Sequence, residues 1–166
     1  MAEKQETDQD ATHILANDHR KVEDLFEEYE SASDNRKKTE IAHRICTELK
    51  VHAQIEEEIF YPALKGKVDD DLLKEAYVEH DGAKLLINDL ADGSATDEHY
   101  DAKVTVLKEQ IEHHVKEEEK QNENMFQQAR AADVDLEELG RRLITRKEEL
   151  MAESGRLPPA EMTTIK

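Results

Sequence analysis

The chain has 166 residues, a length that suits one domain, and its 41 Asp and Glu against 23 Lys and Arg give a formal net charge of −18. A surface this acidic repels nucleic acid and anionic lipid, so we expect neither nucleic acid nor a membrane as a partner. No apolar run approaches the roughly 18 residues of a membrane span. The single cysteine, Cys46, cannot form an internal disulfide, so the sequence predicts a cytoplasmic protein. Its oligomeric state stays open.

Only five Gly and three Pro, beside many Glu, Lys, Ala and Leu, predict an all-α protein. Residues 1–11 are predicted to be a disordered lead. Apolar residues at helical spacing predict helices at about residues 12–30, 36–62, 70–91 and 96–129, and a fifth at about 136–153. Short connections favour an up-down-up-down four-helix bundle over residues 12–130, followed by an additional C-terminal helix and tail over 131–166.

Two of the helices carry a histidine followed four residues later by a glutamate, on the side that should face the core. In the second helix His52 and Glu56 continue the apolar stripe that contains Leu49. In the fourth helix His114 and Glu118 stand in the same relation to the apolar residues three and seven positions before the histidine. Both pairs are therefore expected to point into the bundle.

The fourth helix offers a second register, because His113 and Glu117 have the same spacing. That register would put Gln110 on the apolar stripe in place of Ile111. The sequence therefore favours His114 over His113 as the inward-facing histidine.

The first and third helices contribute one histidine each, His19 and His80. The intervals to the paired histidines are 33 residues (19 to 52) and 34 residues (80 to 114), which indicates an internal repeat of two helical halves. The repeat brings four histidines and two glutamates to one level of the bundle. The other members of the glutamate runs 56–58 and 117–119 are predicted to be solvated.

This collection of side chains predicts a metal site, because buried carboxylates without partners would be costly. Imidazole and carboxylate donors suit iron, manganese or zinc. If both glutamates and a further oxygen bridge two octahedral ions, roughly two of about twelve coordination positions remain for water or a small ligand. A metal-free network of His–Glu hydrogen bonds is the alternative.

The sequence resembles hemerythrin-like proteins of the HHE cation-binding group over about residues 12–130. The likeness lies in Ile14 to His19 with Val22 and Leu25-Phe26, in His52 through Pro62, and in Glu112 to Glu119 with Met125-Phe126, while Glu79-His80 takes the place of the third-helix ligand. The resemblance implies a non-haem di-iron centre, with two iron ions joined by an oxo or hydroxo bridge. It implies six ligands: His19, His52, Glu56, His80, His114 and Glu118.

The third helix departs from the pattern of the oxygen-carrying members, which have two histidines four residues apart. Here the positions four residues from His80 are Ala76 and Lys84, so one iron lacks a histidine. Glu23, Tyr77 or water are candidates for its place. Two glutamates also replace one Glu and one Asp of the carriers. These differences favour a centre that reacts with oxygen or peroxide, or that senses a small molecule or iron, over stable oxygen carriage.

Three functions remain open. The first is a di-iron protein that binds or senses a small ligand such as O₂ or NO, or iron itself. The second is a di-iron enzyme that turns over hydrogen peroxide or oxidises Fe(II). The third is a bundle in which metal is only structural, which the open coordination positions disfavour. No nucleophile or nucleotide-binding motif accompanies the histidines, so an organic substrate is not expected.

Overall fold

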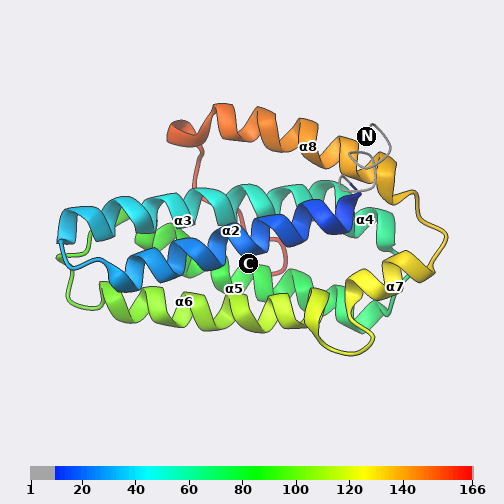
Figure 1. The fold of residues 1–166 in the computed structure, drawn as a ribbon, viewed down its shortest axis with the longest axis horizontal. Coiled ribbons are helices and arrows are strands. Elements are labelled where there is room, and N and C mark those ends of the chain that lie inside the picture. Colours follow the sequence, from blue (N-terminus) through cyan, green and yellow to red (C-terminus); the bar gives the residue numbers. More distant parts are fainter. Residues whose placement is uncertain (1–9, 166) are drawn as a thin grey trace.

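The computed structural model describes residues 10–165, which form helices and no strand, as the sequence predicts (Figure 1). Most of the predicted lead, residues 1–9, lies outside the described residues. Four long helices form an antiparallel bundle, so the all-α four-helix prediction is confirmed. Their bounds are α2 Ala11–Ser31, α3 Asn35–Ile55, α5 Asp70–Asp92 and α6 Tyr100–Val115.

Aspartates begin several of these helices, because a carboxylate accepts the free N–H groups of a first turn and is favoured by the helix dipole. Asp10 accepts the N–H of Thr12 at 2.8 Å and so fixes the start of α2. Asp34 and Asp69 cap α3 and α5 in the same way.

Both α3 and α6 continue into one turn of π-helix, at Glu56–Phe60 and Lys116–Lys120. Such single turns within α-helices are frequent at functional sites. In the first, the N–H of Tyr61 bonds to the carbonyl of Glu56, and α4 (Tyr61–Leu64) follows. The bond brings Tyr61 round to the side of Glu56, whereas five residues of an α-helix would turn it about 140° away.

The fourth helix is shorter than predicted. Its π turn ends at Lys120, and a loop with Glu123 at a φ of 56° leads to a separate helix, α7 (Met125–Ala131). Asn124 begins α7, and its side-chain oxygen accepts a first-turn N–H at 2.9 Å. The predicted continuous helix to about residue 129 is therefore wrong, because Asn124 caps a new helix.

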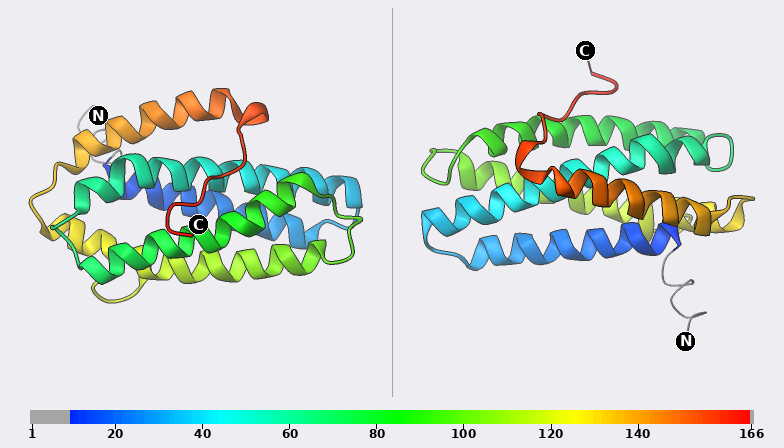
Figure 2. Two further views of the ribbon diagram at one scale, coloured as in Figure 1. Left: turned by 180° about the vertical axis from the view of Figure 1, so that it is seen from behind. Right: turned by 90° about the horizontal axis from the view of Figure 1, so that it is seen from above.

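The predicted fifth helix is α8, Leu136–Ala152, and it packs on the outside of the bundle against α2 and α3. Leu139 and Leu143 of α8 are buried in this contact. A short 3-10 turn, Ser154–Arg156, follows. The chain then returns across the bundle, and its C-terminal end lies beside α5 (Figure 2).

The apolar core consists of two clusters, one towards each end of the bundle. On α2, Leu15 belongs to one cluster and Val22 to the other, with His19 between them. On α5, His80 separates the two clusters in the same way. The predicted histidine level therefore forms a polar layer between two water-excluding cores. No helix among residues 10–165 is long and apolar enough to cross a membrane.

Candidate metal centre

The structure brings all six predicted ligands together in this polar layer, one histidine from each long helix and one glutamate from each π turn. Their side chains are buried, with exposed fractions between 0% and 6%. The six are His19, His52, Glu56, His80, His114 and Glu118. The alternative register lies outside, because the side chain of His113 is 63% exposed.

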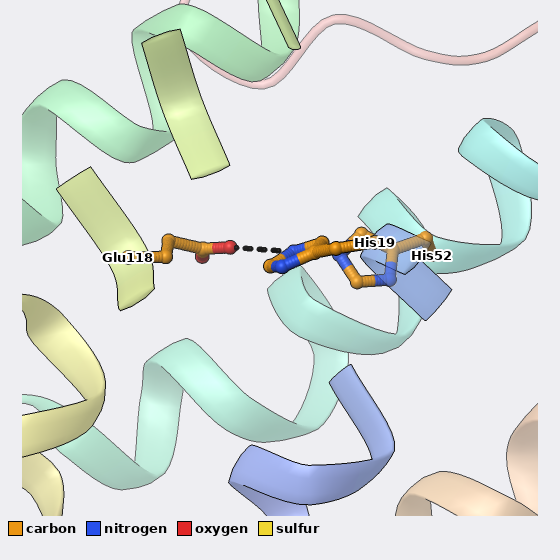
Figure 3. A group of neighbouring side chains, drawn as sticks. All are labelled: His19, His52 and Glu118. Carbon is orange, nitrogen blue, oxygen red and sulfur yellow. Dashed lines mark ion pairs between the residues drawn. The ribbon is translucent and has the colours of Figure 1, made fainter. Parts of the chain in front are cut away.

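The donor atoms form two groups of three. His19, His52 and Glu118 make one group, and Glu56, His80 and His114 make the other, with the donor atoms of each group within 4.8 Å of one another. Figure 3 shows Glu118 extending towards the rings of His19 and His52.

The two glutamates lie between the groups. Glu118 Oε1 is 3.2 Å from Nε2 of His19, while its Oε2 is 3.3 Å from Nε2 of His114. Glu56 Oε1 is 3.0 Å from Nε2 of His52 and 3.2 Å from Nε2 of His80. Each carboxylate therefore faces both groups, which is the arrangement that bridging requires.

Tyr61 contributes a seventh polar group that the sequence analysis missed. Its hydroxyl donates to Glu118 Oε2 at 2.7 Å and lies 3.2 Å from Nε2 of both His80 and His114. The ring is fully buried. The hydroxyl thus lies beside the group from which the second third-helix histidine is missing.

The residues proposed from the sequence for this position lie elsewhere. Glu23 pairs at the surface with Arg20 and Lys120. Tyr77 packs edge-on against Tyr61, with ring centroids 5.2 Å apart. Periodicity did not indicate Tyr61, because only the π turn brings it to the side of Glu56. No periodic pattern in the sequence marks this turn.

Several buried donor atoms have no hydrogen-bond partner among the described residues. They are Nε2 of His19 and His52, both carboxylate oxygens of Glu56 and Oε1 of Glu118. They approach one another at 3.0–3.2 Å, but not in hydrogen-bonding geometry. Unpaired buried polar atoms are rare and costly. A metal ion would satisfy converging imidazole and carboxylate lone pairs together, so these residues fit a metal of the iron, manganese or zinc type.

A second layer of carboxylates holds the histidine rings, and each accepts from a ring Nδ1. The four pairs are Asp18 with His52 at 3.0 Å, and Glu57 with His80, Glu79 with His114 and Glu119 with His19, each at 2.9 Å. These bonds leave every Nε2 pointing to the centre. Such contacts fix the tautomer and the orientation of metal-binding histidines.

The second layer forms a closed ring around the bundle. Each carboxylate is the immediate sequence neighbour of one predicted ligand but holds the histidine of the next helix, in the order α2, α3, α5, α6 and back to α2. The prediction that the outer glutamates of both runs are solvated is therefore wrong for Glu57 and Glu119. Their adjacency to Glu56 and Glu118 was the available signal.

Each second-layer carboxylate is held in turn from the outside. Asp18 bonds to Lys147 of α8, Glu57 to Lys84 and Thr163, Glu79 to His113, and Glu119 to Arg20. The contacts of Asp18 and Glu57 involve residues outside the four-helix bundle. The C-terminal part of the chain thus reaches two of the four histidine supports.

The charges of the centre shift its ionisations. Burial lowers the pKa of His52, but the charge of Glu56 and the bond to Asp18 outweigh it and raise that pKa to about 10. Burial is likewise outweighed at His19 and His114, whose pKa values are raised by neighbouring carboxylates. The pKa of Glu56 lies well below its ordinary value despite burial, chiefly through the charge of His52. A metal that binds these nitrogens must therefore displace protons.

A cavity of about 30 Å³ adjoins the centre. The four histidines and Asp18 line it together with apolar side chains, among them Val22, Leu49, Ala83, Ile87 and Ile111. One water molecule needs roughly 10–15 Å³ of cavity volume, so this cavity admits a molecule of two or three heavy atoms.

Comparison with known proteins agrees with this architecture. A crystal structure of a hemerythrin HHE cation-binding domain-containing protein from Mycobacterium kansasii superposes with a TM-score of 0.72 at 23% identity, covering 87% of this chain and 88% of that one. A DNA nickase of Nostoc sp. is 29% identical over 112 residues, which are 68% of this chain and only 32% of that protein. The family profile of the hemerythrin HHE cation-binding domain matches residues 10–126. The chain therefore belongs to the hemerythrin HHE cation-binding domain family.

Proposed function

We propose that this chain binds two iron ions in its polar layer and uses them to bind or sense a small ligand such as O₂ or NO. Membership of a cation-binding family supports the binding of metal ions by this chain. The proposal of a small ligand rests on the cavity of about 30 Å³ beside the four histidines.

Two ions, rather than one, are supported by the division of the donors into two groups and by the position of the glutamates. The two oxygens of Glu118 face histidines of different groups, at 3.2 and 3.3 Å. Each donor group would hold one ion, the first with His19 and His52 and the second with His80 and His114. Mixed nitrogen and oxygen donors without thiolate accept iron, manganese or zinc, and the resemblance to hemerythrin-like proteins is the reason for proposing iron among them.

The cavity limits the chemistry to small molecules. Apart from the four histidines and Asp18 its lining is apolar, and its volume of about 30 Å³ excludes an organic substrate. Bound iron would supply an exchangeable coordination position, while the surrounding side chains exclude bulk water and hold the histidines in one tautomer. The net charge of −18 gives no attraction to a polyanion, so we propose no nucleic-acid partner. The buried cysteine, Cys46, is compatible with the reducing cytoplasm that we propose as the location.

Turnover of hydrogen peroxide is the second candidate, and Tyr61 favours it. A phenol oxygen in place of a neutral imidazole is a hard donor that stabilises ferric over ferrous iron. This would disfavour reversible oxygen carriage, which starts from the ferrous state. Peroxide also fits the cavity by size.

The experiment combines elemental analysis with ligand titration. Purified protein should contain about two irons per chain, and NO or O₂ added to the ferrous form should change the visible spectrum stoichiometrically. Sustained oxygen evolution from peroxide would favour the enzyme instead. Absence of metal, together with no uptake of Fe(II) under anaerobic conditions, would refute the proposal.

A cavity-filling variant separates ligand binding from metal binding. Ala83→Val adds two methyl groups to the wall of the cavity, and Ala76→Val makes the same change at a buried position of the same helix that does not line it. We expect both variants to keep their iron and only Ala83→Val to bind NO more weakly, by about tenfold or more. Equal affinities would place the ligand elsewhere.

A further inference from the structure

The segment Leu157–Ile165 is joined to one polar stripe of α5. Asn88 exchanges two bonds with the backbone of Ala160, at 3.0 and 2.8 Å. Asp81, which is fully buried, accepts from the N–H of Thr163 at 2.8 Å, the hydroxyl of Thr164 at 2.6 Å and the N–H of Ile165 at 2.9 Å. The segment therefore has a defined path along α5.

Lys84 lies at the centre of this contact and is 6% exposed. Its ammonium group bonds to Glu57 at 2.8 Å, to the carbonyl of Glu161 at 2.9 Å and to the hydroxyl of Thr163 at 3.2 Å. Lys84 occupies the position four residues after His80, and its side chain turns away from the metal centre to meet the C-terminal segment.

Glu57 connects the segment with the metal centre. The hydroxyl of Thr163 donates to Glu57 Oε1, and Lys84 binds both oxygens. Glu57 Oε2 accepts from Nδ1 of His80 at 2.9 Å. One unbroken line of hydrogen bonds therefore runs from the C-terminal segment to a ligand ring.

The outer contacts matter because Glu57 stands at the wall of a solvent-facing cavity. This cavity, of about 420 Å³, lies between α3 and the segment 157–163, and Glu57, Lys84 and Thr163 line it. A glutamate side chain has three rotatable torsions. If only an imidazole held this carboxylate, water would compete for its free oxygen and the side chain would adopt several orientations. Thr163 donates to the other oxygen and Lys84 bonds to both, so the orientation of the carboxylate is fixed from the outside as well.

We propose that the segment Leu157–Ile165 is a positioning element of the metal centre, in which Thr163 and Lys84 fix Glu57 and Glu57 fixes the His80 ring. The inference rests on the proposed metal site and adds a part of the chain beyond the family match to it. Thr163 acts through Glu57, so it is a positioning residue and not a ligand.

Two adjacent threonines provide a matched test. Thr163→Val removes a hydroxyl that bonds to Glu57, while Thr164→Val removes one that bonds only to Asp81. Both keep the backbone bonds of the segment and a side chain of the same shape. Loss of a direct partner of a ligand weakens metal binding about 10–100-fold, and Thr163 is one contact further out, so we expect Thr163→Val to release one of its two irons to a chelator about tenfold faster than wild type. Thr164→Val should stay within about twofold of wild type.

A second measurement uses the metal-free protein. The Nδ1–H of His80, held by Glu57, should give a slowly exchanging proton signal in nitrogen-15 histidine NMR. The signal should exchange faster in Thr163→Val and be unchanged in Thr164→Val. Melting temperatures of all three proteins control for a general loss of stability.

The outcomes separate the two proposals. If wild type holds two irons and the two variants behave alike in both measurements, the positioning role is overturned and the metal site stands. If wild type binds no metal, the proposed function fails, and the NMR comparison still decides whether the segment fixes His80. Faster release in Thr163→Val, with a melting temperature equal to that of Thr164→Val, supports the inference.

Discussion

Replacing Tyr61 by phenylalanine removes one oxygen from the centre and little else. The ring is fully buried and keeps its packing against Tyr77 and Phe60, with centroids 5.2 and 6.1 Å away. What is lost is the bond to Glu118 at 2.7 Å and the hydroxyl beside His80. The variant therefore tests a donor and leaves the shape of the core unchanged.

The magnitude follows from the contacts that remain. A hydrogen bond to a charged acceptor contributes about 1.5–3 kcal/mol. The imidazole nitrogens at 3.2 and 3.3 Å are not in hydrogen-bonding geometry, but they still compensate the charge of Glu118, so the lower end of this range applies. Metal-free Tyr61→Phe should then be about 1.5 kcal/mol less stable than wild type, or about 3–6 °C lower in melting temperature for a domain of this size.

The loaded protein gives the functional measurement. If the Tyr61 oxygen binds ferric iron, the wild-type spectrum contains a phenolate-to-iron charge-transfer band that Tyr61→Phe lacks, and one of the two irons should leave about 10–100 times faster. Tyr77→Phe is the matched control, since that ring contacts Tyr61 but supplies no atom to the donor groups. A Tyr61→Phe protein with the spectrum and iron content of wild type would refute the argument and leave Tyr61 as a packing residue.

Three further predictions concern the donors, their protons and the C-terminal contact. His114→Ala should lose at least about half of the bound iron by elemental analysis, whereas His113→Ala, at an exposed position, should keep it; equal losses would contradict the register. Because the pKa of His52 is raised to about 10, metal-free protein should lose stability as pH rises from about 6.5 towards 10. For the same reason metal binding at pH 7 should release protons, which calorimetry in buffers of different ionisation enthalpy measures. The pKa of Asp81 is raised by burial but lowered further by the N–H and hydroxyl groups that donate to it, so its stabilisation is present above its unfolded-state pKa of about 3.9 and is lost as pH falls through the folded value. The stability difference between wild type and Asp81→Asn should thus be constant above about pH 5 and shrink below about pH 4; denaturant titrations that show a constant difference down to pH 2 would contradict it.

The sequence alone determined the bundle and the inner ligand candidates. Helical periodicity is a local property, and a histidine that continues an apolar stripe, as His52 and His114 do, must face the core when the helix packs. Duplication of the pattern in two halves then placed His19 and His80 at the same level. The family resemblance rested on the same residues, and the family match over residues 10–126 confirms it.

The tertiary structure decided the surroundings of those ligands. Tyr61 reaches the centre only because a π turn changes the helical register after Glu56, and no periodic pattern predicts such a turn. Each of the outer carboxylates bonds to a histidine of the next helix. The role of Glu57 therefore depends on the packing of α5 beside it, and in the sequence alone Glu57 is indistinguishable from a solvated glutamate. Thr163 stands more than a hundred positions from Glu57 along the chain and meets it only after the C-terminal segment returns across α5. Contacts of this kind depend on where whole helices lie, and that arrangement exists only in the folded chain.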